Sequence, residues 1–479
     1  RAVGATAPGL PGVVIGATDA IAWSMTNFFG DHEDIVPVEV DPDDRSRYRA
    51  PDGFRPFETR TLPHPDGRVE LVLRTTVYGP IVFPDNLDPR PLALASTALR
   101  DGMTNLGLLD LHHVDTLEEA LDVGARWYGP SQNLVVAAAD GRIGWVVTGC
   151  FPKRRGFDGK APRSWADGEF GWDGLLDESA RPRAIVEDGV LFSANGRMLP
   201  LERARLLTRC WAPSDRQRRI EELLAADGPF AEADFRAMQL DVDLAALAPF
   251  RDVFLEVVPE GEPDPTLARY RAALVDWDGT AAVDQRAVGV LLAFQAELRE
   301  RVLGPVLERA REVNPGFVHT WMLVDEPLFR LLEERPAHFL PANVPSWTAH
   351  LRAAADAIGR RREGRPPLDT PWGERNRLRA AHPFARSLPA FLAGRLAAPA
   401  HPQPGTTQTV RVAAPAYGAS LRLVASPGHL DEATMHLPIG QSGHPLSPHL
   451  MDAHEAWAEG RAEPLLAGPP VSTFTLAPR

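Results

Sequence analysis

The chain has 479 residues, of which 44% are hydrophobic and 24% charged, as in a globular protein large enough for a sizeable core or two domains. Its formal net charge of -13 argues against a nucleic-acid partner, because phosphate binding requires clustered Lys and Arg. No apolar run approaches the ~18–20 residues that span a bilayer, so we expect neither a membrane segment nor a membrane partner.

The first forty residues predict two strands and an acidic turn. The segments Pro8–Gly16 and Ile21–Asn27 are apolar runs joined by a turn at Thr18-Asp19. The acidic segment Gly30–Asp34 follows them directly. Taken by itself, this segment is typical of a solvated acidic loop.

A further strand and a helix are expected before the middle of the chain. The alternation of Val69, Leu71 and Leu73 with polar residues predicts a strand. Thr116 and Glu119 have the spacing of a capping box, in which each side chain bonds the other residue's backbone N–H. We therefore predict that a helix begins at residue 117.

The segment around residue 140 predicts a β-hairpin. Two apolar runs flank Asp140-Gly141, a dipeptide typical of a two-residue hairpin turn. Asn133 opens the first strand, and Arg154 follows the second. Because a hairpin returns both ends to the same edge of its sheet, we predict that Asn133 and Arg154 share one site there. The alternative is an Asn on an edge strand and an Arg on the surface, without a common role.

Helices dominate the sequence from about residue 201 to residue 365. Apolar residues recur there at spacings of three and four, a pattern that is nearly always a core-facing stripe. A proline at the first helical position is favourable, so Pro305 is expected to begin a helix. The predicted helices include Leu267–Leu274, Val288–Val302, Pro305–Val313 and Ser346–Arg361.

The pattern returns to strands beyond residue 366. Alternating apolar residues predict strands at Thr407–Val412 and Gly418–Val424. The order of strands, helices and strands predicts an α+β fold. We expect its parts to be a first core section at 1–200, a mainly helical insertion at 201–365, and a return to the core sheets at 366–479.

The sequence indicates neither a cysteine-based site nor an organic cofactor. Cys150 and Cys210 are too few for a metal quartet or a disulfide framework, and we expect two buried thiols, with a single disulfide as the alternative. No glycine-rich phosphate loop or dinucleotide fingerprint occurs, so no organic cofactor is expected.

Several segments, in the same order along nearly the whole chain, resemble the penicillin acylase family of N-terminal-nucleophile hydrolases. Their shared order is more specific than any one motif. One departure is Thr18, where the family usually has Asn. The segments are Pro8–Gly16, Ile21–Asn27, Gln132-Asn133, Asp140–Trp145, Gly149, Pro152, Arg154, Phe192–Arg197, Pro438–Gly443 and Ser447–Asp452.

This resemblance implies a four-layer αββα sandwich and an amidohydrolase. The family cleaves the linear amide of a small acylated molecule, such as a β-lactam or an acyl-homoserine lactone, through an acyl-enzyme on an N-terminal Ser. The chain starts at Arg1, so we expect a large-subunit fragment without that Ser or the small subunit of the same precursor. Such a fragment should be inactive alone. The resemblance also implies a periplasmic or secreted location.

The resemblance assigns roles to three polar residues. Asn133 would supply a donor to the oxyanion hole, where one such donor is worth roughly 10²–10³ in rate. Arg154 would orient the catalytic groups. Asn195, in the segment 192–197, would lie near the substrate cleft.

The resemblance also implies a structural Ca²⁺ at the acidic turn. Asp31 and Asp34 would provide carboxylate oxygens, and Glu33 its backbone carbonyl. Hard cations prefer several oxygen ligands, and a tight acidic turn supplies three.

Two other functions compete with the acylase hypothesis. The spacing of His449, Asp452 and His454 could place two imidazoles and a carboxylate at a metal, as in a metal-dependent hydrolase. A non-catalytic remnant or binding module is the second alternative. A cleavage junction with a Ser upstream in the gene would favour the enzyme over either.

Overall fold

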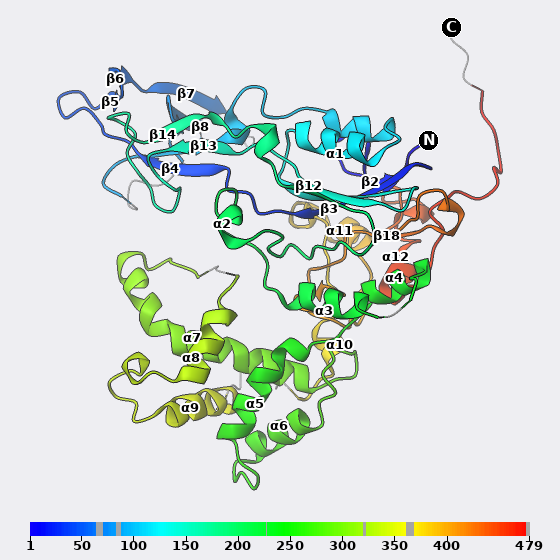
Figure 1. Cartoon of the computed structure of the whole chain (residues 1–479). Helices are drawn as coiled ribbons and strands as arrows, with labels where there is room; N and C mark the ends of the chain where they lie inside the picture. The colour runs from blue at the N-terminus through cyan, green and yellow to red at the C-terminus, as the bar shows by residue number, and fades with distance from the viewer. Residues whose placement is uncertain (64–69, 83–87, 227, 320–321, 361–367, 476–479) are drawn as a thin grey trace. The chain divides into compact units, whose positions relative to one another are not determined.

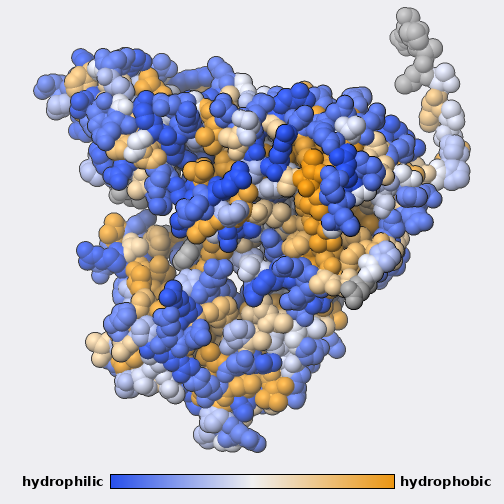
Figure 2. Space-filling model, in the orientation of Figure 1, coloured by the Kyte–Doolittle hydropathy of each residue, from blue (hydrophilic) through white to orange (hydrophobic). Residues whose placement is uncertain are grey.

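A computed structural model describes residues 1–63, 70–82, 88–226, 228–319, 322–360 and 368–475 (Figure 1). The chain divides into two compact units, one of residues 6–15 and 23–212, the other of 1–5, 16–22 and 213–479. The face in Figure 2 is mainly hydrophilic, with separate hydrophobic areas. Among the helices of the described ranges, none is long and apolar enough to cross a membrane.

The largest sheet has six strands in the order β1-β2-β3-β11-β12-β15. The predicted strand pair at the start of the chain is confirmed, with strands on both sides of the turn at Thr18-Asp19. The strands are β1 (Val3–Thr6), β2 (Val13–Ala17), β3 (Ile21–Asn27), β11 (Gln132–Ala138), β12 (Ile143–Val147) and β15 (Arg183–Val186).

The central hairpin β11–β12 is confirmed, but its turn differs from the prediction. Ala138 N donates to Arg142 O at 2.9 Å and Gly141 N donates to Ala138 O at 3.0 Å, which leaves a three-residue loop at 139–141. Gly141 has φ 92°, a left-handed conformation that glycine adopts without strain. Asp140-Gly141 therefore forms part of a turn closed by a bulge, the next commonest hairpin connection after two-residue loops.

Helix α1 (Leu117–Arg126) packs on the hairpin. The predicted capping box is confirmed, since Thr116 Oγ1 accepts from Glu119 N at 3.3 Å and the Glu119 carboxylate accepts from Thr116 N. A Cβ built on Gly144 would lie 2.9 Å from Leu121. The helix can therefore approach the sheet closely only because residue 144 has no side chain.

Shorter antiparallel strands surround a second core in the first unit, which includes Val36, Tyr48 and Trp165. The predicted strand near residue 71 is confirmed as β8, but Val69 lies outside the described residues. These strands are β4 (Glu33–Pro37) with β10 (Leu92–Ser96), β5 (Arg47–Ala50) with β6 (Gly53–Pro56), β13 (Pro152–Arg155) with β14 (Gly171–Leu175), and β7 (Glu58–Pro63), β8 (Glu70–Thr76) and β9 (Gly79–Pro80).

Helices build the core of the second unit, as the apolar stripes predict. Phe250, Phe254 and Phe294 are fully buried at its centre. The helices are α3 (Asp215–Leu224), α4 (Glu232–Gln239), α5 (Ala248–Val257), α6 (Pro265–Val275), α7 (Ala287–Val313), α8 (Asp325–Glu334) and α9 (Trp347–Arg360). Short helical segments are α2 (Leu201–Ala204), α10 (Trp372–Arg375), α11 (Ala390–Leu396) and α12 (His454–Glu459).

The prediction that Pro305 begins a helix is wrong, because Pro305 lies inside α7, a single helix of 27 residues. A proline inside a helix leaves the carbonyl four residues earlier without its usual donor, here that of Arg301. His350, on the adjacent helix α9, is buried close to Arg301, so α7 passes through the proline while packed against its neighbour.

The segment 407–412 is not the predicted strand. Thr409 Oγ1 accepts from Thr406 N at 2.8 Å and donates to Arg411 O at 2.8 Å, so side-chain bonds replace a ladder. The strands that follow are short: β16 (Ala413–Ala414), β17 (Tyr417–Gly418), β18 (Arg422–Val424) and β19 (Thr434–His436). Residues 368–475 belong to the same unit as the helices.

Both cysteines are free, as expected. Cys150 is buried, whereas Cys210 is only partly buried, so the prediction of two buried thiols holds for one of them.

Candidate active site

Asn133 is completely buried near the start of β11, and Trp145 on β12 fixes its orientation. Trp145 Nε1 donates to Asn133 Oδ1 at 3.0 Å. Since an indole N–H can only donate, the amide oxygen must face Trp145 and the amide nitrogen must point away from it. The two residues share a face because Val135, two positions after Asn133, pairs with Trp145.

The Asn133 nitrogen points toward two hydroxyl groups. It donates to Thr26 Oγ1 at 3.2 Å and to Ser193 Oγ at 3.4 Å, and these hydroxyls lie 2.8 Å apart. Ser193 Oγ also accepts from Asn195 N at 3.3 Å, so Asn133 and Asn195 belong to one cluster. Such a fixed amide can donate, without turning its own side chain, to an oxyanion that takes the place of one of these hydroxyls.

Asn195 has a left-handed backbone at φ 66°, which is uncommon for a residue other than glycine. Its amide nitrogen donates to Asn27 O at 3.2 Å, at the end of β3. This bond holds the loop of Ser193 against the sheet. The sequence motif 192–197 could have indicated Ser193, and the segment ending at Asn27 could have indicated Thr26, but nothing in the sequence pointed to Trp145 as the partner of Asn133.

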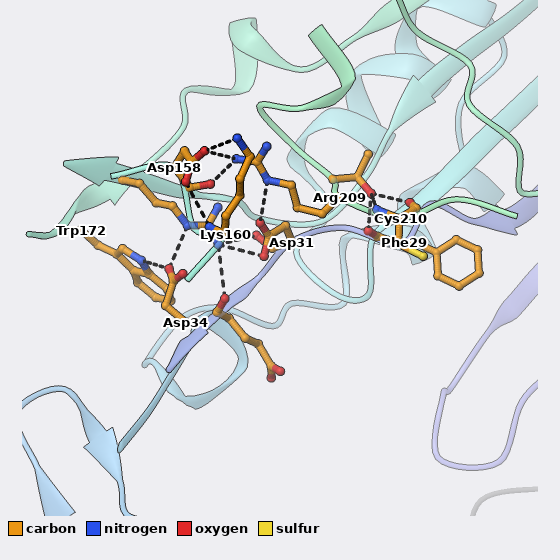
Figure 3. A network of polar contacts seen from close by, with 11 residues as sticks. Phe29, Asp31, Asp34, Asp158, Lys160, Trp172, Arg209 and Cys210 are labelled. Atoms are coloured by element: carbon orange, nitrogen blue, oxygen red, sulfur yellow. Dashed lines mark hydrogen bonds and ion pairs between the residues drawn. The ribbon is translucent and has the colours of Figure 1, made fainter. Parts of the chain in front are cut away.

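Arg154, on β13, lies in a separate network with the acidic turn. Figure 3 labels Asp31, Asp34 and Trp172 of this network. The Nε of Arg154 donates to Asp34 Oδ2 at 2.8 Å, and its Nη2 lies 2.9 Å from Asp31 Oδ1 and 3.3 Å from Glu33 O. Trp172 Nε1 donates to the same Asp34 oxygen at 2.7 Å. Arg154 therefore contacts all three residues predicted to bind calcium, and no contact joins it to Asn133 in the described part of the chain.

Burial raises the pKa of Asp31 and the pKa of Asp34, and the positive charge of Arg154 opposes both shifts. The Arg154 side chain is itself only 9% exposed. A Cβ on Gly159 would lie 2.6 Å from Arg154 Nε, so a glycine is needed for the loop to pass this guanidinium. In this network Arg154 is the main cation that compensates two carboxylates, and Arg209 lies 3.9 Å from Asp31.

His32 ties the acidic turn to the hairpin. Its Nδ1 donates to Cys150 O at 2.8 Å, since a carbonyl can only accept, and its Nε2 lies 2.8 Å from Ser131 Oγ. Burial lowers the pKa of His32, which favours the neutral ring that accepts from Ser131. This Ser–His pair resembles a nucleophile and its base, but Ser131 is only 4% exposed, so the pair is structural.

The acidic turn brings the predicted calcium ligands together, but not in a form that fits the ion. Each of the three oxygen-bearing groups lies within 3.3 Å of a nitrogen of Arg154. A Ca²⁺ ion requires roughly six to eight oxygen ligands, and a guanidinium among them would repel it. Within the described ranges, no group of three or more His, Cys, Asp or Glu could hold a metal. Calcium binding by Asp31, Glu33 and Asp34 stays a prediction that would require Arg154 to move away.

The alternative metal site at His449, Asp452 and His454 does not form. His449 Nδ1 lies 2.8 Å from Asp452 Oδ2 in an exposed pair. His454 is buried, and its Nδ1 donates to Pro438 O at 2.8 Å. One imidazole is therefore on the surface and the other in the interior, because α12 begins at residue 454 and packs this side of the helix inward. The metal-dependent hydrolase prediction is wrong.

Excess chelator is expected to leave the melting temperature of the full-length protein unchanged, because Arg154 already supplies the positive charge at the acidic turn. A ligand that binds only the folded state raises stability by mass action, so removal of a bound ion would lower it. Thermal unfolding with EDTA, and again after added CaCl₂, measures this. A drop with EDTA that CaCl₂ reverses would show that calcium displaces the guanidinium.

Comparison with solved structures shows that the chain has the fold of a penicillin G acylase. It matches the thermostable penicillin G acylase from Alcaligenes faecalis with a TM-score of 0.68 and 18% identity, covering 100% of this chain and 92% of that one. The predicted α+β class is thereby confirmed. The chain matches the penicillin amidase family over residues 1–470 and belongs to that family.

Relatives of the chain carry acylase names, as two of them show. Acyl-homoserine lactone acylase QuiP of Pseudomonas syringae pv. tomato is 26% identical over 96% of this chain and 60% of its own length. Penicillin acylase 2 proenzyme of a Pseudomonas species is 28% identical over 97% of this chain and 61% of its own length. The chain therefore spans about 60% of the length of each of these two relatives.

Proposed function

We propose that the parent protein is an acylase that hydrolyses the linear amide of a small acylated molecule, such as an acyl-homoserine lactone or a β-lactam. The orientation of Asn133 carries this proposal. Trp145 holds the amide oxygen, so the nitrogen is the end of the amide that would donate to a developing oxyanion in place of Thr26 or Ser193. The names of the relatives support the same substrate classes.

In this proposal the acyl-enzyme forms on the N-terminal serine that the family resemblance implies, and no residue of 1–479 is assigned to that role. Asn195 would support the substrate cleft through Ser193 and Asn27. A small subunit from the same precursor would be the protein partner, in keeping with the name proenzyme of one relative. A periplasmic or secreted location is part of the proposal and is tested by cell fractionation.

The test is to incubate purified full-length protein with acyl-homoserine lactones of several chain lengths and with penicillin G, and to follow release of the free amine. Amine release from either class supports the proposal. Opening of the lactone ring with the amide left intact contradicts it. Saturable binding of these amides without any turnover would instead indicate a non-catalytic binding module.

A further inference from the structure

A pocket of about 340 Å³ in the first unit has an unusually basic lining for a chain of formal net charge -13. Only one acidic residue, Asp158, contributes to it. Its cationic residues are Lys153, Arg154, Arg203, Arg205 and Arg209.

Nearby acids compensate some of these charges but not all. Arg154 pairs with Asp31 and Asp34, and Arg205 Nη1 lies 3.1 Å from Glu202. Arg209 lies 3.9 Å from carboxylate oxygens of Asp31 and Asp158 and its Nη2 donates to Asp158 O, but its Nε is buried without a hydrogen-bond partner among the described residues.

Lys153 and Arg203 make no ion pair with any residue that the structure describes, and both are exposed. The pocket therefore presents two uncompensated positive charges and one buried donor, that of Arg209. An anion would compensate both positive charges and accept a hydrogen bond from Arg209.

The rest of the lining is apolar. Phe157, Leu176 and Leu207 contribute to the pocket, and so does Leu206, which is 69% exposed. An inorganic anion would leave these side chains without a contact. A volume near the lower end of the roughly 300–1,000 Å³ that ligand sites occupy suits a short-chain or single-ring compound.

We propose that this pocket binds a small organic carboxylate with an apolar body. The carboxylate would lie between Lys153 and Arg203, within reach of Arg209, and the apolar body would lie against Leu206 and Phe157. Amide hydrolysis by an acylase releases acids of this kind, but the proposal stands on the pocket and does not require that activity.

The test measures equilibrium binding of hexanoate, hexanamide and inorganic phosphate to the full-length protein by calorimetry at constant ionic strength. Hexanoate is expected to bind most tightly, because hexanamide lacks the charge and phosphate lacks the apolar body. In the double variant Lys153→Gln/Arg203→Gln, hexanoate binding should weaken by about tenfold or more, since charge-assisted hydrogen bonds are lost.

Arg183→Gln is the matched control, because Arg183 is exposed, outside the pocket, and paired only with Asp122 on the surface. Its hexanoate affinity should stay within about twofold of the wild type. The comparison between variants separates this pocket from binding elsewhere, the active site included. Equal hexanoate affinity in the double variant and the control would overturn the proposal, as would phosphate or hexanamide binding as tightly as hexanoate.

Discussion

An Asn133→Ala variant of the full-length enzyme is expected to lose roughly 10²–10³ in kcat on its best amide substrate, the typical loss when one oxyanion-hole donor is removed. The Asn133 amide would stabilise the transition state more than the bound substrate, so KM should change little. Steady-state kinetics on the amide found by the activity test measures both constants. A loss in kcat of less than about tenfold would mean that Asn133 is not an oxyanion donor.

Two further variants distinguish the loss of the Asn133 donor from the loss of the Trp145 hydrogen bond that orients it. Asn133→Asp keeps the size of the side chain but replaces the N–H donor with an acceptor, so its kcat should fall as far as that of Asn133→Ala. Trp145→Phe keeps one aromatic ring but removes the N–H that bonds to Asn133 Oδ1, together with part of the indole volume. Trp145 is a positioning residue, and its replacement should lower kcat by a smaller factor without changing KM.

Stability must be followed in the same variants. Asn133→Ala leaves Trp145 Nε1 buried without an acceptor, which costs about 1–3 kcal/mol. Kinetics should therefore be measured well below the melting temperature of each variant. If kcat fell only in proportion to the fraction of protein unfolded, the loss would be structural and the proposed role of Asn133 would be wrong.

The parts of this fold that depend on local sequence could be predicted from it. The hairpin follows from Asp140-Gly141 between apolar runs, and the start of α1 follows from Thr116 and Glu119. In both cases the interacting residues lie within a few positions of one another, so spacing alone indicates the contact.

Predictions from the sequence were wrong or incomplete where a residue far away along the chain determines the local structure. The sequence near Pro305 gives no sign that α7 continues through it while packed against α9, a helix more than forty residues further along the chain. In the same way, the motif containing Arg154 does not show which acids surround it, because Asp31 and Asp34 are more than a hundred residues earlier. Contacts of this kind depend on how strands meet in three dimensions.

An Arg154→Met variant is expected to lose about 3–5 kcal/mol of unfolding free energy, the usual cost of removing one partner from a buried ion pair. The side chain of Asp34 is 4% exposed, so its charge cannot be rehydrated without opening the structure, and that of Asp31, at 18% exposed, is only partly hydrated. Methionine retains most of the apolar stem, which limits the loss of packing. Urea unfolding at neutral pH measures the free energy.

The matched control is Arg155→Met, one residue along β13, where the arginine is 46% exposed and pairs with Asp173 on the surface. An exposed pair of this kind contributes about 0–1 kcal/mol, so the control should remain close to wild type. If the two variants lost similar amounts, the Arg154 cluster would be no more important to folding than a surface ion pair.

The free energy of unfolding of Arg154→Met should also depend on pH, and this dependence distinguishes uncompensated charge from lost packing. Burial already raises the pKa of Asp31 and of Asp34 above the unfolded value, and loss of Arg154 removes the main effect opposing it. A carboxyl whose pKa is raised by folding binds more protons in the folded state than in the unfolded state. The loss of unfolding free energy that it causes is therefore complete above the folded pKa, and this loss becomes smaller as the pH falls toward the unfolded pKa. The difference between wild type and variant should therefore narrow between about pH 7 and about pH 4. A difference that stays constant over this range would show that lost packing, not uncompensated charge on Asp31 and Asp34, destabilises the variant.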